Sequence, residues 1–435
     1  MRTDQIRSSA EKVFGELEKR FIHHDTGLLL NYADQNGEVS LPTADEIQNG
    51  KPSHMSWNTP IEDGAYYSGL YFSALCDNKL RRLIPQTAQA AERIADGLIS
   101  LSESDDGVPG FVARNYAGFP KAHYACGSED QTFPWFYGLY RFWKSGASSD
   151  KQRLRCASAL VHVAEALHKS DYRIPCSTVS FGYKGNFSAG EINNVAKLVF
   201  VQRAMYEITG DRIWHDRYAS SLSECPDGKT ETRLAILRHG VGYPVYDGES
   251  VFYCLENGEY SRDVFNKDVR VITFPFFTMT MASIAINAVC EMEDVPDITC
   301  PLAEALARDA NAAATHICRY KGFDVENAPK YSDNWRIMNT LWCRQQNAEQ
   351  AAALAWREMP LWFCECPRFP YENAYVREPL FAAYATLLSP VPPEQQVSDE
   401  ICRMLAHYRW DRLNTSTFYS ALLVIARLLH FQEIK

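Results

Sequence analysis

The chain has 435 residues, of which 46% are hydrophobic, so its composition is that of a globular protein and not of a disordered one. Asp and Glu outnumber Lys and Arg by 54 to 44, and no run of basic residues is longer than a pair such as Arg81-Arg82. Because nucleic-acid-binding proteins carry a basic stripe, we expect no nucleic-acid partner. No apolar stretch reaches the ~20 residues of a membrane-spanning helix, so no membrane partner is expected.

The cysteines and the N-terminus bear on compartment and cofactors. There are 13 cysteines, an odd number, and Cys364 and Cys366 form the one close pair. A single pair without a nearby histidine is a poor zinc signal, so reduced thiols, no metal and no cofactor are expected. The first residues, Met1 to Ser9, lack the apolar segment of a signal peptide. A cytoplasmic location is therefore predicted, or a periplasmic one if a signal peptide has been removed.

Helical periodicity dominates the chain. An amphipathic helix is expected at 5–22, and a long polar stretch follows at 32–60. The next helix places Tyr67, Leu70 and Tyr71 on one face, at the spacing of a helix with one buried side. Aromatic and alanine-rich segments then alternate, which predicts helices packed in pairs. These further helices are predicted at 84–101, 133–144, 151–168, 191–208, 211–222, 274–291, 300–318, 333–345, 347–357, 372–388, 397–408 and 416–431.

The pairing of helices also predicts the domain organisation. The segment 226–272 mixes glycine and proline with Val, Tyr and Phe, and is predicted to be an insertion of loops and short strands. No linker rich in Pro, Ser or Gly divides the chain, so 1–435 is expected to form one domain. Paired helices with long loops on one side predict an all-α fold, an (α/α)6 toroid of six helical hairpins. A helical-repeat solenoid is the alternative, and it would need a cleaner repeat.

One motif occurs twice. Glu62-Asp63 and Glu129-Asp130 each stand just before an aromatic segment that contains Gly-Leu-Tyr. Such a repeat predicts stacked helical hairpins that each bring a carboxylate to a common place. Paired carboxylates are what the cleavage of a glycosidic bond requires, and the aromatic content of 12% suits the stacking of sugar rings.

The residues around this motif resemble a known superfamily. Residues Trp57 to Gly64 (WNTPIEDG), which lead into the first Gly-Leu-Tyr helix, resemble the opening of the six-hairpin glycosidases. The second motif, Glu-Asp-Gln-Thr, is similar to the second inner helix of unsaturated glucuronyl and rhamnogalacturonyl hydrolases. The resemblance implies that Asp63 and Asp130 act in catalysis, and that Asp130 protonates the double bond of an unsaturated sugar and activates water. That family usually has histidine before the second aspartate, where this chain has Glu129.

A general base and a general acid require carboxyl groups with opposite protonation states, and therefore different surroundings. The positive N-terminal end of a helix keeps a nearby carboxylate ionised, as a general base or nucleophile requires. A general acid needs a raised pKa, which burial or a second carboxylate provides. Glu62 and Glu129 are the alternatives to Asp63 and Asp130, if the chain turns the other acid of each pair inward. The competing interpretation is that each aspartate is an ordinary N-cap.

The loop before the second motif offers substrate-binding groups. Arg114 and His123 suit a sugar carboxylate or hydroxyls, and Tyr116 and Tyr124 suit stacking. The same side chains suit a polysaccharide lyase, in which a tyrosine removes the proton beside a carboxylate that His or Arg neutralises. An ordinary surface loop with buried tyrosines is the structural alternative.

Further binding residues are predicted beside other helix starts. Trp57 is a stacking platform close to the first motif, and His54 lies beside it. Asn194 presents an amide at the start of a later helix. Trp335, followed by Arg336, combines a stacking face with a carboxylate clamp. Each of these side chains also fits a structural role in the core or in a loop.

Together these features predict a carbohydrate-active enzyme. We expect a glycoside hydrolase that acts on an oligosaccharide substrate, more specifically an unsaturated uronide, with Asp130 as proton donor and water activator and Asp63 assisting. A lyase on the same scaffold is one alternative. A sugar epimerase would rely on histidines, of which His54, His123 and His239 lie in predicted cleft loops, and a non-catalytic helical interaction scaffold is the third. Nucleotide-binding and serine-hydrolase motifs are absent from the sequence.

Overall fold

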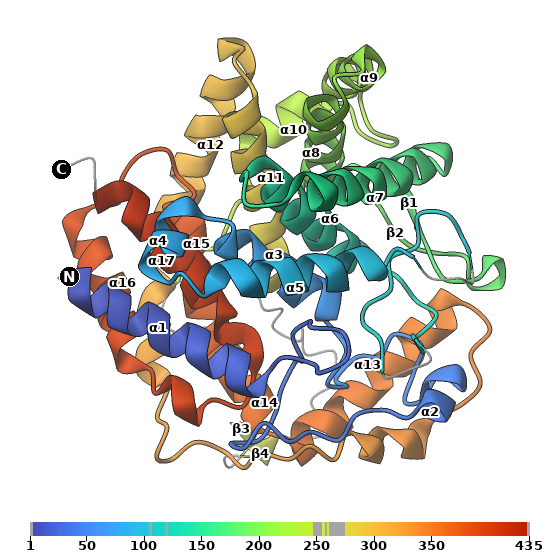
Figure 1. Cartoon of the computed structure of the whole chain (residues 1–435), viewed down its shortest axis with the longest axis vertical. Helices are drawn as coiled ribbons and strands as arrows, with labels where there is room; N and C mark the ends of the chain where they lie inside the picture. The colour runs from blue at the N-terminus through green and yellow to red at the C-terminus, as the bar shows by residue number, and fades with distance from the viewer. Residues whose placement is uncertain are drawn as a thin grey trace.

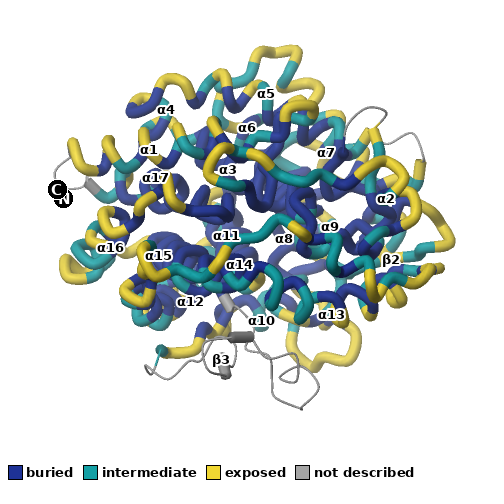
Figure 2. Tube along the Cα trace, turned by 90° about the horizontal axis from the view of Figure 1, so that it is seen from below, coloured by how far each residue is buried: buried dark blue, intermediate teal, exposed yellow. Residues whose placement is uncertain are grey.

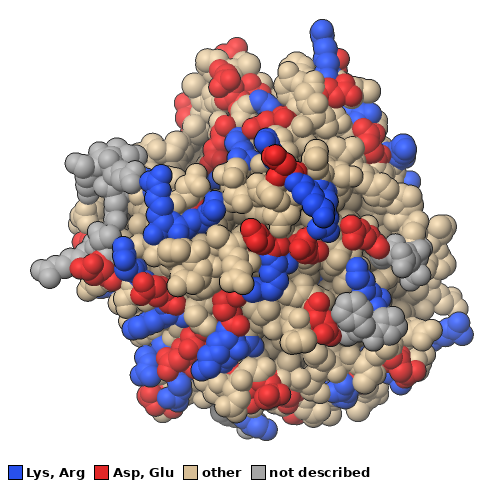
Figure 3. Space-filling model, viewed as in Figure 1, with Lys and Arg blue, Asp and Glu red and all other residues tan. Residues whose placement is uncertain are grey.

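Helices make up most of the described chain, which confirms the prediction of an all-α protein. The computed structural model describes residues 3–103, 107–117, 121–246, 255–256, 259–260 and 275–432. Within these residues, no helix combines the length and the apolar character that crossing a membrane requires. Figure 3 shows acidic and basic side chains interspersed over one face of the molecule, without a broad area of one sign.

Six helices of the described chain contact one another in a closed succession, and we call them the inner helices. They are α3 (Gly64–Leu75), α6 (Glu129–Lys144), α8 (Ile192–Thr209), α11 (Pro275–Met292), α15 (Glu378–Leu387) and α17 (Ser420–Gln432). Each packs against the next, and α17 packs against α3. Every residue of α3 is buried, as expected for a helix that is apolar on all sides. Figure 2 shows buried segments at the centre of the molecule and exposed ones at its periphery.

Six amphipathic helices of the described chain lie outside the inner ones. They are α1 (Thr3–Arg20), α5 (Thr87–Ser100), α7 (Asp150–Lys169), α9 (Arg212–Ser223), α12 (Pro296–Ala314) and α16 (Gln395–His407). In α16 the buried residues are Ile401, Met404 and Leu405, at the spacing that places them on one face. α5 packs on α3 and α6, α12 packs on α11 and α15, and α1 packs on α17. α1 and α5 lie in front of the inner helices in Figure 1.

The remaining elements of the described chain are the 18-residue helix α13 and several short helices, strands and turns. They are α2 (Ala44–Gln48), α4 (Asn78–Leu83), α10 (Arg233–His239), α13 (Ala348–Glu365), α14 (Arg368–Glu372), the hairpin β1 (Arg173–Pro175) and β2 (Tyr183–Asn186), the pair β3 (Leu255–Glu256) and β4 (Glu259–Tyr260), and 3₁₀ turns at Val179–Phe181, Ile317–Gly322, Trp335–Leu341, Trp410–Arg412 and Ser416–Tyr419. The predicted polar stretch at 32–60 therefore contains one helix that was not predicted, α2. Its N-cap is Thr43, which forms a reciprocal capping box with Glu46.

Three predicted segments differ from the structure. The segment 333–345 forms a 3₁₀ helix at Trp335–Leu341 and not an α-helix, and Nε1 of Trp335 donates to the carbonyl of Ser40. The predicted insertion 226–272 contains a helix, α10, beside the short pair β3 and β4, and residues 247–254, 257–258 and 261–274 lie outside the described chain. The predicted helix 372–388 is interrupted.

The interruption has a covalent cause. Residues Asn373–Arg377 form a π-helical turn between α14 and α15. Pro379 has no N–H to donate to the carbonyl of Tyr375, four residues earlier, so the α-helical pattern cannot continue through it. The hydroxyl of Tyr408 donates to that carbonyl instead, at 2.7 Å. Arg377, at the end of the π turn, is thereby placed at the start of α15.

The repeated glycine of Gly-Leu-Tyr sets the closest approach of two inner helices. A Cβ atom at Gly69 in α3 would lie 2.2 Å from the carbonyl oxygen of Pro134 in α6, and one at Gly138 would lie 2.4 Å from the carbonyl oxygen of Gly69. The two backbones are therefore in contact where these glycines meet. This contact holds the starts of α3 and α6, and so the two Glu-Asp motifs, next to each other.

A buried acid in α13 makes the stability of the fold dependent on pH. Glu358 is 0% exposed, and burial raises its pKa to about 8, although Ser53 and Arg357 lower it in part. The folded state therefore keeps this proton up to about pH 8, whereas the unfolded chain releases it near pH ~4.3. Between these two values the folded state binds more protons than the unfolded one, so stability falls as pH rises.

Glu358→Gln should remove this dependence. In the parent protein, this acid should lower the free energy of unfolding by up to ~1.4 kcal/mol for each pH unit, and the variant should lack this decrease. The variant should therefore be more stable than the parent protein at pH 7.5 and equally stable near pH 4.5. Urea unfolding at several pH values measures this difference. Glu349→Gln is the matched control, because Glu349 is exposed on the same helix. Equal slopes for the Glu358→Gln variant and the parent would contradict the prediction.

Candidate active site at the start of the inner helices

The first Glu-Asp motif lies immediately before α3. Asp63 is the residue that precedes the helix, and it is 4% exposed, whereas Glu62 is partly accessible. Asn58 has a φ of +63°, a conformation that Asn tolerates better than most residues, and this turn directs its backbone N–H to the Oε2 atom of Glu62 at 2.6 Å. The turn before α3 therefore fixes the side chain of Glu62.

Asp63 is held on both carboxylate oxygens. Its Oδ1 atom accepts a hydrogen bond from Nε2 of Gln131 at 2.7 Å, and its Oδ2 atom accepts one from Nδ2 of Asn31 at 3.0 Å. The backbone N–H of Asp63 donates to Oδ1 of Asn31 at 2.8 Å. Nη1 of Arg114 lies 3.9 Å from Oδ1. Because Gln131 belongs to the second motif, this network joins the two Glu-Asp motifs directly.

The two acids of the first motif have raised pKa values. Burial is the main cause for both, and it is opposed by the positive charge of Arg114. For Glu62, the neighbouring charge of Asp63 raises the pKa further, and the pKa lies well above its ordinary value. For Asp63, the charge of Asp130 adds to the rise. The three carboxyl groups therefore interact electrostatically, and Glu62 holds its proton at a higher pH than an exposed glutamate does.

Asp130 lies in the first turn of α6 and is only partly buried. Within the described residues its carboxylate forms no hydrogen bond or ion pair, so its oxygens remain available to a ligand. The other acid of this motif is differently placed. Glu129 packs against Gly185 and accepts a hydrogen bond from the backbone N–H of Asn186 at 3.4 Å. Of the two acids, Asp130 is thus the one that interacts with the first motif.

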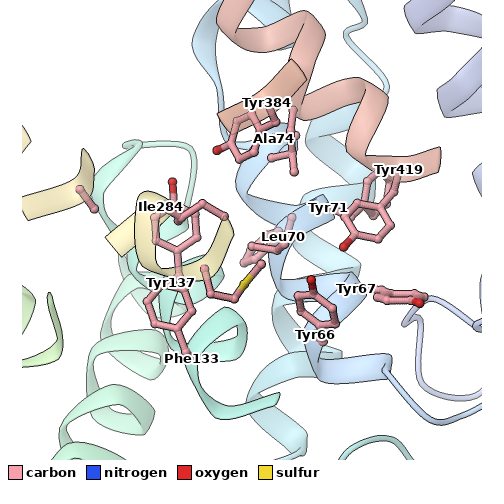
Figure 4. Close-up of a cluster of buried hydrophobic side chains, with 14 of the residues drawn as sticks. Tyr66, Tyr67, Leu70, Tyr71, Ala74, Phe133, Tyr137, Ile284, Tyr384 and Tyr419 are labelled. Atoms are coloured by element: carbon pink, nitrogen blue, oxygen red, sulfur yellow. The ribbon is translucent and has the colours of Figure 1, made fainter. Parts of the chain in front are cut away.

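Aromatic side chains and an arginine at or just before the starts of the inner helices surround the acids. The hydroxyl of Tyr66 donates to the carbonyl of Phe277 at 2.7 Å, and the rings of Tyr67 and Tyr419 are 5.2 Å apart. The guanidinium of Arg377 lies 4.2 Å from the centre of the Phe277 ring, and its charge lowers the pKa of Glu62. Figure 4 shows Tyr66, Tyr67 and Tyr419 together at one end of a buried cluster. The starts of α3, α6, α11, α15 and α17 therefore converge here.

Several buried polar atoms beside the acids lack partners in the described chain. They are the hydroxyl of Tyr67, Nδ2 of Asn58, Nδ2 of Asn115 and Nε of Arg114. A buried polar group without a hydrogen bond costs free energy, so native proteins rarely leave several of them together. Asn115 packs against Gly64 at the start of α3, and Asn58 bonds Glu62 through its backbone. These atoms are the groups that a polar ligand at the acids would satisfy.

The remaining predicted residues lie in other surroundings. The ring of His54 packs on Phe181 at 4.7 Å, and burial lowers its pKa to about 4, so it is neutral at physiological pH. Trp57 packs edge-on against Trp356 at 5.1 Å. Asn194, in the first turn of α8, has a buried Oδ1 atom without a partner in the described chain.

The loop that precedes the second motif is tied to the backbone. The hydroxyl of Tyr124 donates to the carbonyl of Lys51 at 2.6 Å, and that of Tyr116 donates to the carbonyl of Ser100 at 2.7 Å. Nδ1 of His123 lies 3.1 Å from the carbonyl oxygen of Tyr124. Of the four predicted side chains in the described part of this loop (Arg114, Tyr116, His123 and Tyr124), Arg114 is the one that lies against Asp63.

Trp335 and Arg336 serve the core instead of the acid cluster. Trp335 is 0% exposed and its Nε1 atom donates to the carbonyl of Ser40 at 2.6 Å. Arg336 forms a two-pronged ion pair with Glu46, with distances of 2.6 and 2.8 Å. A guanidinium engaged in this way is not available to a substrate carboxylate, so in place of the predicted clamp Arg336 joins the 3₁₀ turn Trp335–Leu341 to α2.

No protein-family model, no curated protein and no solved structure matches this chain. In the described part of the chain, no three His, Cys, Asp or Glu side chains are grouped so as to hold a metal ion.

Proposed function

We propose that the chain is an (α/α)6 toroid and a glycoside hydrolase that acts on an oligosaccharide at the acid cluster. The closed succession of inner helices, covered by amphipathic outer helices, supports the toroid. One observation carries the function. Two acids with raised pKa values, Glu62 and Asp63, interact with a third, Asp130, whose carboxylate has no partner in the described chain.

The roles follow from the surroundings of each acid. Glu62, whose pKa is raised by burial and by Asp63, is the protonated acid that donates to the sugar. Asp130 activates the attacking water as a general base. Asp63 assists by its charge, since both of its oxygens are already bonded. This assignment moves the proton donor from Asp130, as the sequence predicted, to Glu62.

A uronide is the substrate class that we favour. Arg114 and Arg377 place positive charge beside the acids, and a sugar carboxylate bound there would be stabilised by that charge. The tyrosines at the same end of the inner helices supply faces and hydroxyls for a sugar ring. An unsaturated uronide is the more specific proposal.

Neither a lyase nor an epimerase is favoured by a particular contact. The hydroxyls of Tyr116 and Tyr124, which a lyase would use as a base, are bonded to backbone carbonyls. Of the histidines that an epimerase would use, His54 packs on Phe181, and His239 pairs with Glu231 at 2.8 Å. The contacts of these side chains therefore give us no reason to prefer either reaction.

The first experiment mixes the protein with saturated and unsaturated uronic-acid oligosaccharides and follows the ultraviolet absorbance of the sugar double bond. A falling absorbance is expected, because hydrolysis of an unsaturated uronide removes the double bond. A rising absorbance would identify a lyase and overturn the proposal. If the absorbance is constant, release of reducing sugar from saturated glycosides is measured next, and its absence as well would reject hydrolysis.

Tyr67→Phe tests whether the cluster binds a ligand. The hydroxyl of Tyr67 is buried without a partner in the described chain, so its removal should leave stability unchanged within about 0.5 kcal/mol or raise it slightly. If the hydroxyl bonds a substrate, kcat/KM should fall about tenfold. Tyr71→Phe is the matched control, because the hydroxyl of Tyr71 bonds Glu18 at 3.0 Å, away from the acids. That variant should lose stability and keep its activity.

A further inference from the structure

A cavity of about 390 Å³ lies at the opposite end of the inner helices from the acid cluster. Its walls come from the C-terminal parts of α3, α6, α11, α15 and α17. The side chains that matter here are Tyr137, Arg141, Glu291, Tyr384 and Arg427. The volume is within the range of pockets that hold small molecules.

The cavity contains more positive than negative charge. Nη1 of Arg141 pairs with Oε2 of Glu291 at 2.5 Å, and Nη2 of Arg427 lies 3.1 Å from Oε1 of the same carboxylate. Burial alone would raise the pKa of Glu291, but the two guanidiniums lower it below its ordinary value. One carboxylate therefore serves two permanent cations, and one positive charge at this wall is without a counter-charge from Glu291.

Two phenol groups add unused donors. Tyr137 and Tyr384 are each 3% exposed, and within the described residues neither hydroxyl forms a hydrogen bond. Both side chains line the cavity. Figure 4 shows them at the other end of the buried cluster from Tyr67, with Leu70 lying between these two ends. The apolar side chains of the cluster thus separate this cavity from the acids.

We propose that this cavity binds a small oxyanion, the phosphate or carboxylate group of a metabolite, between Arg141 and Arg427, with the hydroxyls of Tyr137 and Tyr384 as donors. Guanidinium groups bind such anions through pairs of parallel hydrogen bonds. A bound anion would supply the missing counter-charge and satisfy the two hydroxyls. The inference stands independently of the proposed hydrolase activity, because the apolar cluster lies between the two sites.

A purely structural role makes a different prediction. The arginines could serve only to join the C-terminal ends of α6, α11 and α17 through Glu291, where the helix carbonyls favour cations. Removal of Glu291 would then weaken the fold and change no affinity for anions. If an anion binds, removal of Glu291 leaves both guanidiniums to the anion and strengthens its binding.

Isothermal titration calorimetry and thermal unfolding of the full chain, with sodium phosphate and with sodium citrate against sodium chloride of equal ionic strength, test the proposal. We expect saturable binding and a rise of Tm that depends on anion concentration. Phosphate and citrate distinguish a phosphate from a carboxylate as the preferred group. Arg427→Gln should weaken binding about tenfold or more, and Glu291→Gln should keep or strengthen it.

Two further variants keep the test decisive. Tyr384→Phe, which leaves the ion pairs intact, should weaken binding severalfold even if an arginine variant fails to fold. Arg155→Gln, which removes a surface ion pair with Asp96, should bind as the parent does. The proposal is overturned if neither anion shows saturable binding, or if Arg427→Gln and Tyr384→Phe respond to both anions as the parent does, because general stabilisation by salts acts equally on all variants.

Discussion

Asp130→Asn is expected to lower kcat on an accepted oligosaccharide by about 10² to 10⁴-fold, the contribution of a positioned general base. The carboxylate of Asp130 forms no hydrogen bond within the described chain, and asparagine has the same shape. The fold should therefore be retained, with an unfolding midpoint close to that of the parent, and KM should change little. Steady-state kinetics and urea unfolding of the same preparations measure both quantities.

Glu129→Gln is the matched control for this result. Glu129 occupies the same turn of α6, but its Oε2 atom accepts from the backbone N–H of Asn186. We expect this variant to keep its activity within a few-fold. Glu62→Gln, which removes the proposed proton donor, should be as inactive as Asp130→Asn. If Asp130→Asn keeps more than a tenth of the parent activity, the carboxylate mechanism is wrong.

Gly69→Ala should destabilise the protein by about 3 kcal/mol or more, although alanine is the better helix former by about 1 kcal/mol. The new Cβ atom would lie 2.2 Å from the carbonyl oxygen of Pro134 and 2.9 Å from the backbone nitrogen of Trp135. These are backbone atoms of α6, so no side chain can rotate to make room. Either α3 and α6 separate or the start of α6 moves, and both changes disturb the acid cluster.

Gly15→Ala, in contrast to Gly69→Ala, is expected to stabilise the protein. Gly15 lies within α1, and a Cβ atom there would meet nothing within 4 Å. The higher helix propensity of alanine then determines the change in stability, so this variant should be more stable than the parent protein by about 0.5–1 kcal/mol. Urea unfolding compares the two substitutions directly. Similar stability changes for Gly69→Ala and Gly15→Ala would show that the contact between α3 and α6 is not tight.

The centre of the candidate site could be predicted because its signal is local. The two Glu-Asp motifs are visible in the sequence, and Gln131, which bonds Asp63, belongs to the second one. The helical period of the segments that follow then indicates that each motif stands at a helix start. In both motifs, the acids and the glycine that allows close packing occur within a dozen residues.

The rest of the site has no such signal. Asn31, Arg377 and Tyr419 reach the acids from distant parts of the chain, and each lies in a segment that also reads as ordinary core or loop. Trp335 and Arg336 show the converse error. An aromatic residue followed by arginine looks the same in a sequence whether it binds a substrate or, as here, joins a 3₁₀ turn to Ser40 and to Glu46 of α2. Such partners depend on tertiary contacts that local pattern does not encode.

The segment from Leu413 through α17 packs against α1 and α3, and this has a consequence for how the chain folds. The guanidinium of Arg20, at the end of α1, donates to the carbonyl of Leu413 at 2.7 Å, across 393 positions of sequence. Contacts of such separation slow folding, because the intervening chain must be ordered before they form. During synthesis α3, which is apolar on all sides, emerges long before α17 exists to cover it. α5 and α6 cover other parts of α3 earlier, but until α17 is made the part of α3 that α17 covers stays exposed and prone to aggregation.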